Sequence, residues 1–346
     1  MYPCVEIKLS GILHNLNILK TACNSRGISL ALVTKVLGGN LSLVQEIVKQ
    51  GQIDTICDSR VQNLKAFKDL PVEKWLIRSP MICQADDVVQ YADVSLNSEL
   101  SVLQALDLAA YNHRKTHKVI LMYEGGDLRE GCYYDELSQL ITECDRLSNI
   151  EVLGIGINLS CLNDTVPNEH NMSDFISAVD CLEAHHGKKF PVISGGASSS
   201  AHMLFTQGLP QRINNLRMGE AVFLGNIPVY DQPFPGAKED NFILKAQIIE
   251  LKKKPSSPNH TPDSDTDLMY RAIVALGKQD IYLPGLSCVD DRIRMIGGSS
   301  DHVILDVTGC CDDYAVGSIV EFKMNYNCLL NAMTSNYIEK YVTLSQ

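Results

Sequence analysis

The sequence predicts a (β/α)8 barrel followed by a mostly β C-terminal domain. Across roughly the first two thirds of the 346 residues, short β-branched runs alternate with longer amphipathic stretches, and we count eight such runs. Strand–helix units repeated over about 200–250 residues are typical of a closed barrel of parallel strands. After about residue 235 helical spacing becomes scarce and strand-like runs predominate. We therefore place the barrel at residues 1–234 and the β-domain at residues 235–346.

The predicted barrel strands are short apolar runs at residues 28–35, 53–57, 74–78, 93–96, 118–123, 151–157, 190–194 and 220–224. Between them lie segments with helical spacing, such as residues 41–50 and 134–147. An open, doubly wound sheet is the alternative, because strand counting from one sequence errs by about one or two strands.

The C-terminal domain is predicted from four strand-like runs at residues 242–249, 271–276, 302–307 and 319–324. Residues 254–268 are polar and proline-rich, so we expect a flexible loop there. Packing of residues 1–9 with the β-domain is an alternative to their packing with the barrel.

Composition and charge limit the classes of partner. The formal net charge of -11 argues against nucleic acids and anionic membranes as partners. No apolar run approaches the ~20 residues that cross a bilayer, and the first residues lack the basic region and apolar core of a signal peptide. Twelve cysteines without metal-ligand spacing are expected to be reduced thiols. We therefore expect a cytoplasmic protein that acts on a small molecule.

Lys35 ends the first apolar run and is the first candidate for chemistry. Active sites of such barrels lie at the carboxyl ends of the strands. Apolar neighbours there would lower the pKa of the Lys35 amine and suit it to carbonyl chemistry. The alternative is a lysine whose stem lies on apolar surface and whose amine is in solvent.

Two segments near the seventh and eighth runs suggest an anion site. Residues 194–200 are Ser-Gly-Gly-Ala-Ser-Ser-Ser, and residues 214–220 include Arg217, Gly219 and Glu220. Small residues let backbone N–H groups approach a phosphate, and barrels commonly bind phosphate at this position. Together with Lys35, the segments indicate a phosphorylated aldehyde cofactor.

These segments, in this order, resemble those of a known family. Residues 33–36, 124–131, 194–200, 216–220, 272–280 and 297–301 each match one of its motifs. The chain resembles the alanine-racemase-like pyridoxal phosphate enzymes of fold type III, and within them the ornithine and broad-specificity amino-acid racemases. The resemblance covers essentially the whole chain. It implies pyridoxal 5'-phosphate, a free amino acid as substrate, and a homodimer with active sites at the subunit interface.

The resemblance also implies roles for individual residues. Lys35 would be the cofactor lysine and a catalytic base. Arg129 and Asp301 would contact the substrate, and Lys278, with Asp301 behind it, would be the second base. The cofactor-binding residues would be Lys35, Asn158, Ser198, Ser199, Arg217, Gly219, Glu220 and Tyr326.

Departures from the family pattern affect the expected substrate. Lys278 stands where alanine racemases have a tyrosine base, and Asn158 stands where they have a histidine. We therefore favour ornithine, then lysine, alanine or serine. Asp301 and His302 are adjacent on a strand and face opposite sides, so we expect no metal site.

Three alternatives to a racemase stay open at this point. One is a pyridoxal-phosphate-dependent D-amino-acid lyase, either an aldolase or a dehydratase. The others are a non-catalytic pyridoxal-phosphate-binding protein and a barrel enzyme that uses a phosphorylated substrate without this cofactor.

Overall fold

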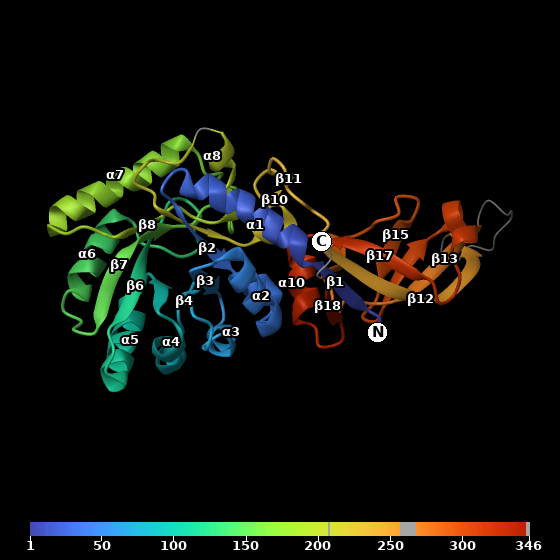
Figure 1. The fold of residues 1–346 in the computed structure, drawn as a ribbon, viewed down its shortest axis with the longest axis horizontal. Helices are drawn as coiled ribbons and strands as arrows, with labels where there is room; N and C mark the ends of the chain where they lie inside the picture. The colour runs from blue at the N-terminus through green and yellow to red at the C-terminus, as the bar shows by residue number, and fades with distance from the viewer. Residues whose placement is uncertain (207, 257–267, 344–346) are drawn as a thin grey trace. The chain divides into compact units, whose positions relative to one another are not determined.

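The computed structural model describes residues 1–206, 208–256 and 268–343. The chain divides into two compact units, one formed by Ile12–Lys238 and the other by Met1–Gly11 together with Glu239–Gln346 (Figure 1). Most of the loop predicted at residues 254–268 lies outside the described residues. Its described ends belong to strands β12 (Phe242–Pro255) and β13 (Leu268–Ala275).

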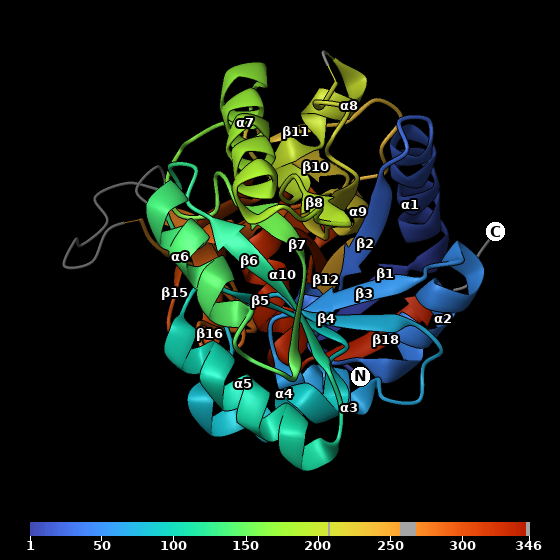
Figure 2. The same cartoon turned by 90° about the vertical axis from the view of Figure 1, so that its left-hand side faces the viewer.

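The first unit is a closed barrel of eight parallel strands, and each strand is hydrogen-bonded to its neighbours around the ring. Figure 2 shows these strands with helices around them. The strands are β2 (Ser29–Val33), β3 (Thr55–Asp58), β4 (Glu73–Leu76), β5 (Val94–Asn97), β6 (His117–Tyr123), β7 (Ile150–Ile157), β8 (Val192–Ser194) and β9 (Asn215–Met218).

The barrel helices follow the amphipathic stretches of the sequence. They are α1 (Leu9–Asn24), α2 (Leu41–Gly51), α3 (Val61–Ala66), α4 (Ala85–Tyr91), α5 (Leu100–His113), α6 (Tyr134–Cys144), α7 (Glu169–His186), α8 (His202–Phe205) and α9 (Glu220–Leu224). In α2 the apolar face is buried, and the Asn40 side chain accepts a hydrogen bond from the backbone N–H of Leu43. This cap satisfies one of the N–H groups that a helix leaves unpaired at its start.

The prediction of the eighth strand is wrong. Residues 220–224 form helix α9, and the strand is β9, a few residues earlier. Helix α9 buries Ala221, Val222 and Phe223, so its short apolar run is indistinguishable by pattern from a buried strand. Strand β9 contains two polar residues, Asn215 and Arg217, whose side chains find partners inside the protein.

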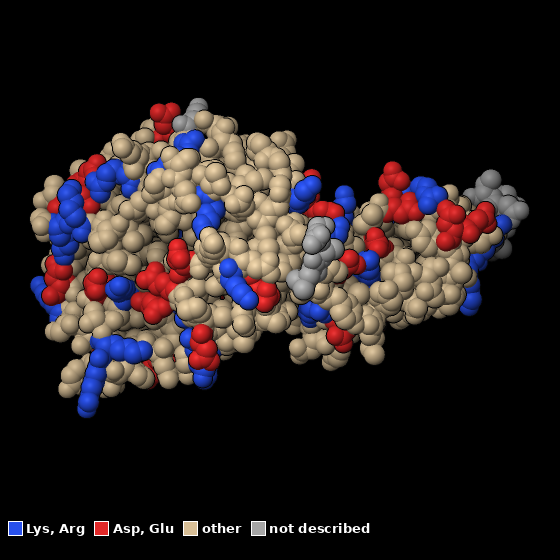
Figure 3. Space-filling model, viewed as in Figure 1, with Lys and Arg blue, Asp and Glu red and all other residues tan. Residues whose placement is uncertain are grey.

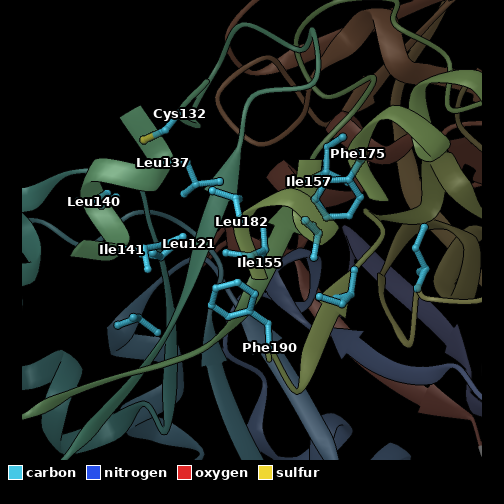
Figure 4. Packing of buried hydrophobic residues seen from close by; sticks show 14 of the residues in the cluster. Leu121, Cys132, Leu137, Leu140, Ile141, Ile155, Ile157, Phe175, Leu182 and Phe190 are labelled. Carbon is cyan, nitrogen blue, oxygen red and sulfur yellow. The ribbon is translucent and has the colours of Figure 1, made fainter. Parts of the chain in front are cut away.

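The barrel contains two apolar layers. Inside the ring lie Ala31, Val33, Cys57, Trp75, Val94, Leu96, Ile120 and Met122. A second cluster joins the outer faces of β6 and β7 to helices α6 and α7, and Figure 4 shows Leu121, Ile155, Phe175 and Leu182 within it. The two layers pack on both faces of the strands and so fix the positions of the strand ends that carry the site residues.

In its described residues, the second unit contains an eight-stranded, mostly antiparallel sheet and the helix α10 (Tyr326–Thr334). Besides β12 and β13, its strands are β1 (Cys4–Lys8), β14 (Leu286–Cys288), β15 (Arg294–Gly298), β16 (His302–Asp306), β17 (Ile319–Met324) and β18 (Glu339–Thr343). Strand β1 pairs antiparallel with β12 and parallel with β18. The N-terminal strand therefore belongs to the C-terminal sheet.

Acidic and basic side chains are interspersed on the face of the barrel unit in Figure 3. Within the described residues, no helix is both long enough and apolar enough to span a bilayer.

Candidate active site

Lys35 lies at the carboxyl end of β2, in the position that the sequence predicts. It begins a single 3-10 turn, directly after the buried Thr34. The Thr34 hydroxyl donates to the Cys57 carbonyl at 3.2 Å and to Asp58 Oδ2 at 3.0 Å. These bonds tie the end of β2 to the end of β3 and fix the backbone from which Lys35 projects.

The surroundings of Lys35 favour the neutral amine. Burial lowers the pKa of Lys35, the Cys161 thiol opposes this shift, and the Arg129 guanidinium adds to it. A lowered pKa leaves more of the lysine in the nucleophilic form at neutral pH.

Arg217 projects from β9 and is buried. Its Nη2 donates to the Ile157 carbonyl at 3.0 Å and to Asn158 Oδ1 at 2.6 Å, and its Nη1 donates to the Ser194 hydroxyl. Gly156 lies beside the guanidinium, and a Cβ there would be 3.1 Å from both Ile120 Cγ2 and Met122 Sδ. Burial lowers the pKa of Arg217.

A second arginine is connected to the first through two side chains. Arg129 donates to both carboxylate oxygens of Glu130, from Nε to Oε2 and from Nη2 to Oε1. Asn158 Nδ2 donates to Glu130 Oε1 at 2.6 Å, while its Oδ1 accepts from Arg217. Burial alone would lower the pKa of Arg129, but the contact with Glu130 outweighs it and raises the pKa above its ordinary value.

The loops after β6 and β7 are joined by a buried carboxylate. Asp127 Oδ1 accepts from the backbone N–H groups of Cys161 at 2.8 Å and Leu162 at 3.0 Å. The Thr165 hydroxyl adds a bond to the Gly126 carbonyl at 2.9 Å. The loop that carries Arg129 is thus held against the loop that follows Asn158.

The predicted phosphate segments meet at the start of α9. The Ser198 hydroxyl accepts from the backbone N–H groups of Gly219 at 3.2 Å and Ala221 at 3.1 Å. A Cβ on Gly219 would lie 2.9 Å from the Val33 carbonyl oxygen, so this close approach requires glycine. The Ser199 hydroxyl instead donates to the Leu159 carbonyl at 2.9 Å.

Glu220, next to this segment, has an altered acidity. Burial raises the pKa of Glu220 to about 7, although Asn226 and Lys35 oppose the shift. A carboxyl group with this pKa is ionised only in part at neutral pH.

The predicted residues of the second unit lie on its loops and at a helix end. Lys278 and Asp301 are exposed on adjacent loops, joined by a bond from Gln279 Nε2 to Asp301 Oδ1 at 2.8 Å. Gly277 permits this approach, because a Cβ there would lie 2.0 Å from the Ser300 carbonyl oxygen. Tyr326 is the first residue of α10 and is half-buried.

Comparison with known proteins identifies the family. The alanine racemase N-terminal domain family matches residues 7–227. The chain belongs to this family. This assignment confirms the resemblance and agrees with the motifs on which it was based.

Two relatives align along nearly the whole chain. The ornithine racemase of Acetoanaerobium sticklandii is 41% identical, covering 98% of this chain and 99% of the relative. The lysine racemase of Thermotoga maritima is 33% identical, covering 98% of each.

Solved structures confirm the predicted fold class of a barrel followed by a β-domain. An alanine racemase from Clostridium difficile 630 in complex with cycloserine has a TM-score of 0.75 at 16% identity, covering 99% of this chain and 96% of that one. The alanine racemase from Bartonella henselae with covalently bound pyridoxal phosphate has a TM-score of 0.76 at 16% identity, covering 98% and 99%. The D-threonine aldolase from Filomicrobium marinum also has a TM-score of 0.76, at 13% identity, covering 96% and 89%. At these identities the likeness concerns the fold alone.

The sequence analysis did not predict contacts for Glu130 and Ser194, although both lie inside its motif segments. Glu130 follows Arg129 directly, and Ser194 ends β8, where its hydroxyl accepts from Arg217. An acidic residue beside a candidate arginine was the available signal for Glu130. Its contact with Asn158 joins residues 28 positions apart and could come only from the fold.

Proposed function

We propose that the chain is a pyridoxal-phosphate-dependent amino-acid racemase that interconverts the L- and D-forms of a free amino acid, with ornithine as the preferred substrate. The observation that carries this proposal is the 41% identity to an ornithine racemase over 98% of the chain. The site supports it, because Arg129 is close enough to both Lys35 and Arg217 to lower the pKa of each, which places the three cations at one end of the barrel.

The residues present fit pyridoxal phosphate. Lys35 would hold it covalently, and Arg217 and Asn158 would contact its ring. In the segment around Ser198, Ser199, Gly219 and Glu220, the Ser198 hydroxyl accepts two backbone bonds and keeps its own hydrogen as a donor for a phosphate, and Tyr326 would add a second hydroxyl. When bound, this cofactor supplies an aldehyde for an amine and a ring that withdraws electrons from the carbon bearing the α-proton.

The residues of the chain then have separate tasks. Arg129 binds the substrate carboxylate, and Lys35 removes or returns the proton at Cα on one face. Arg217 can only donate hydrogen bonds, so it would favour an unprotonated pyridine nitrogen in the cofactor. An unprotonated ring withdraws fewer electrons from Cα. Limited withdrawal favours return of the proton to Cα over transamination.

A second group must act on the opposite face of Cα. We assign this task to Lys278, with Asp301 as the next candidate. Asp301 also offers a carboxylate for the distal ammonium of ornithine. If Asp301 has this second role, Asp301→Asn should raise the KM for ornithine by about tenfold and change the KM for alanine little.

The decisive experiment tests Lys35 and the reaction together. Purified enzyme supplied with cofactor should show a visible absorbance band, and borohydride followed by peptide mapping should find the label on Lys35. Lys35→Ala should lose the band and all racemisation. Chiral chromatography should show loss of optical activity in L-ornithine with uptake of solvent deuterium at Cα. A colourless wild-type protein, unmodified at Lys35, would contradict the proposal, and release of an aldehyde or keto acid would favour the lyase.

We also propose a cytoplasmic homodimer with active sites at the subunit interface. All twelve cysteines are free thiols, which suits a reducing compartment. Large apolar side chains are exposed on the loops that follow β4, β6 and β7, among them Ile82, Leu128 and Leu162. Exposed apolar side chains around an active-site rim favour contact with a second subunit.

A further inference from the structure

We propose that Glu130 is the positioning residue that orients Arg129 toward the substrate α-carboxylate and links this orientation to Arg217 through Asn158. This inference rests on the proposed racemase function, because it assigns the carboxylate to Arg129. It concerns a residue that neither the motifs nor the family resemblance marked as functional.

The first step of the argument is that Glu130 is already engaged by donors of the protein itself. Its Oε1 accepts from Arg129 Nη2 at 2.6 Å and from Asn158 Nδ2 at 2.6 Å, and its Oε2 accepts from Arg129 Nε. Three donors already occupy the carboxylate. Glu130 therefore acts through the groups that it holds.

The second step concerns the edge of the Arg129 guanidinium that Glu130 does not contact. A guanidinium carries its N–H donors in a rigid planar fork. Glu130 holds the Nε and Nη2 edge of Arg129, and Asp127 Oδ2 lies 3.8 Å from Nε. The Nη1 group takes part in none of these contacts. We assign Nη1 to the substrate carboxylate.

The third step is the direction of the Asn158 amide. Asn158 donates from Nδ2 to Glu130 and accepts at Oδ1 from Arg217 at 2.6 Å. Because Glu130 can only accept and Arg217 can only donate, the two residues together fix the direction of the Asn158 amide. Arg217 also donates to Ile157 and Ser194. The series of hydrogen bonds that starts at Arg129 therefore ends on strands of the barrel.

The test separates carboxylate recognition from general damage. Holoenzyme is titrated with L-ornithine and with putrescine, the diamine that remains when ornithine loses its carboxylate, and the change in cofactor absorbance gives each dissociation constant. Wild type should bind ornithine at least about tenfold more tightly than putrescine. Glu130→Gln should reduce this ratio by about tenfold by weakening ornithine alone, and should lower kcat/KM for ornithine by about tenfold to a hundredfold.

The matched control is Glu143→Gln on α6. Glu143 also accepts two hydrogen bonds from an arginine, at 2.7 and 2.8 Å from Arg146 Nη1, but it lies away from the network. The ratio of the dissociation constants for putrescine and ornithine in Glu143→Gln should equal that of wild type. In an Arg129→Ala background, Glu130→Gln should change the ratio no further, because the two residues act as one unit.

Each outcome has a defined meaning. Equal weakening of both ligands by Glu130→Gln, or an unchanged ratio, overturns the inference. If Glu130→Gln does not fold, Glu130→Asp serves instead, and its shorter side chain should give a smaller fall in the same ratio. Wild type that binds ornithine through its carboxylate without racemising it would refute the proposed function and leave this inference standing.

Discussion

At the scale of single residues, the barrel contains a set of buried, hydrogen-bonded polar side chains that is separate from the site. His117 begins β6 and is almost completely buried, and its Nε2 lies 2.8 Å from the Ser95 hydroxyl. Asn97 Nδ2 donates to the same hydroxyl at 2.9 Å. Burial lowers the pKa of His117 to about 4.

This shift predicts a loss of stability in acid. His117 is neutral in the folded barrel, whereas in the unfolded chain it gains a proton at about pH 6.5. Its stabilising contribution is therefore present above about pH 6.5 and is lost as the pH falls toward about 4. The total loss is on the order of 3 kcal/mol.

Urea unfolding across this pH range checks the prediction. His117→Gln should flatten the pH dependence of the unfolding free energy between about pH 6.5 and 4. The control is His170→Gln, whose side chain is 88% exposed on α7, and it should behave as wild type. An unaltered slope in His117→Gln would assign the acid sensitivity to other groups.

Single residues also show what the sequence can predict. The position of Lys35 at a strand end could be predicted because it ends an apolar run, and the close backbone approach at Gly219 because small residues near a strand end permit it. The roles of both residues stay predictions. Contacts between Glu130 and Asn158, or between Arg217 and Ser194, depend on which strand ends become neighbours. That information enters only when the barrel closes.

At the scale of elements, the joined loops after β6 and β7 determine how rigidly Arg129 is held. Asp127→Asn keeps the shape of the side chain but removes the charge that accepts from Cys161 and Leu162. We expect a loss of about 1–3 kcal/mol in local stability and a rise in the KM for ornithine.

Hydrogen exchange of the loop amides measures this effect. The amides of residues 161–163 should exchange faster in Asp127→Asn, while those of β6 should keep their wild-type rates. Unchanged exchange at these three amides would show that the loops are held together by other bonds.

Strand spacing is another property of elements. In β7, a Cβ on Gly154 would lie 2.0 Å from the Val192 carbonyl oxygen, so β7 and β8 approach too closely for any side chain. Gly154→Ala should lower the free energy of unfolding by about 1–3 kcal/mol or more. The matched control is Gly297→Ala in β15, where a Cβ would meet no atom within 4 Å. Equal stability of the two variants would refute this account.

The misplaced eighth strand shows the limit of pattern analysis for elements. An apolar run of five residues suits a buried strand or a buried helix equally well. Gly225, with φ +71°, ends α9 in the left-handed conformation that commonly terminates helices. Gly219 and Gly225 lie at the two ends of the helix and were the available signal for it. The apolar run between them instead led to the prediction of a strand.

At the scale of the whole molecule, the exposed rim residues predict association. Leu128 and Leu162 are 62% and 65% exposed on the loops that border the site. Wild type should sediment as a dimer of the 38.2 kDa chain. Leu128→Asp or Leu162→Asp should weaken this dimer by at least about tenfold, because a charge would be buried at the interface.

A matched surface leucine controls for charge alone. Leu108 is 61% exposed on α5, and Leu108→Asp should leave the dimer intact. Sedimentation velocity at several concentrations distinguishes these cases. A wild-type protein that remains monomeric at every concentration would contradict the homodimer.

The pairing of β1 with β12 and β18 has a consequence for the order of synthesis. The barrel unit ends at Lys238, so its whole sequence is translated before strands β12–β18 of the second unit. Strand β1 precedes the barrel in the chain, whereas both of its partners, β12 and β18, follow the barrel. Strand β1 therefore has no sheet partner while the barrel is being made, gains an antiparallel partner once β12 has been translated, and gains its parallel partner only with β18.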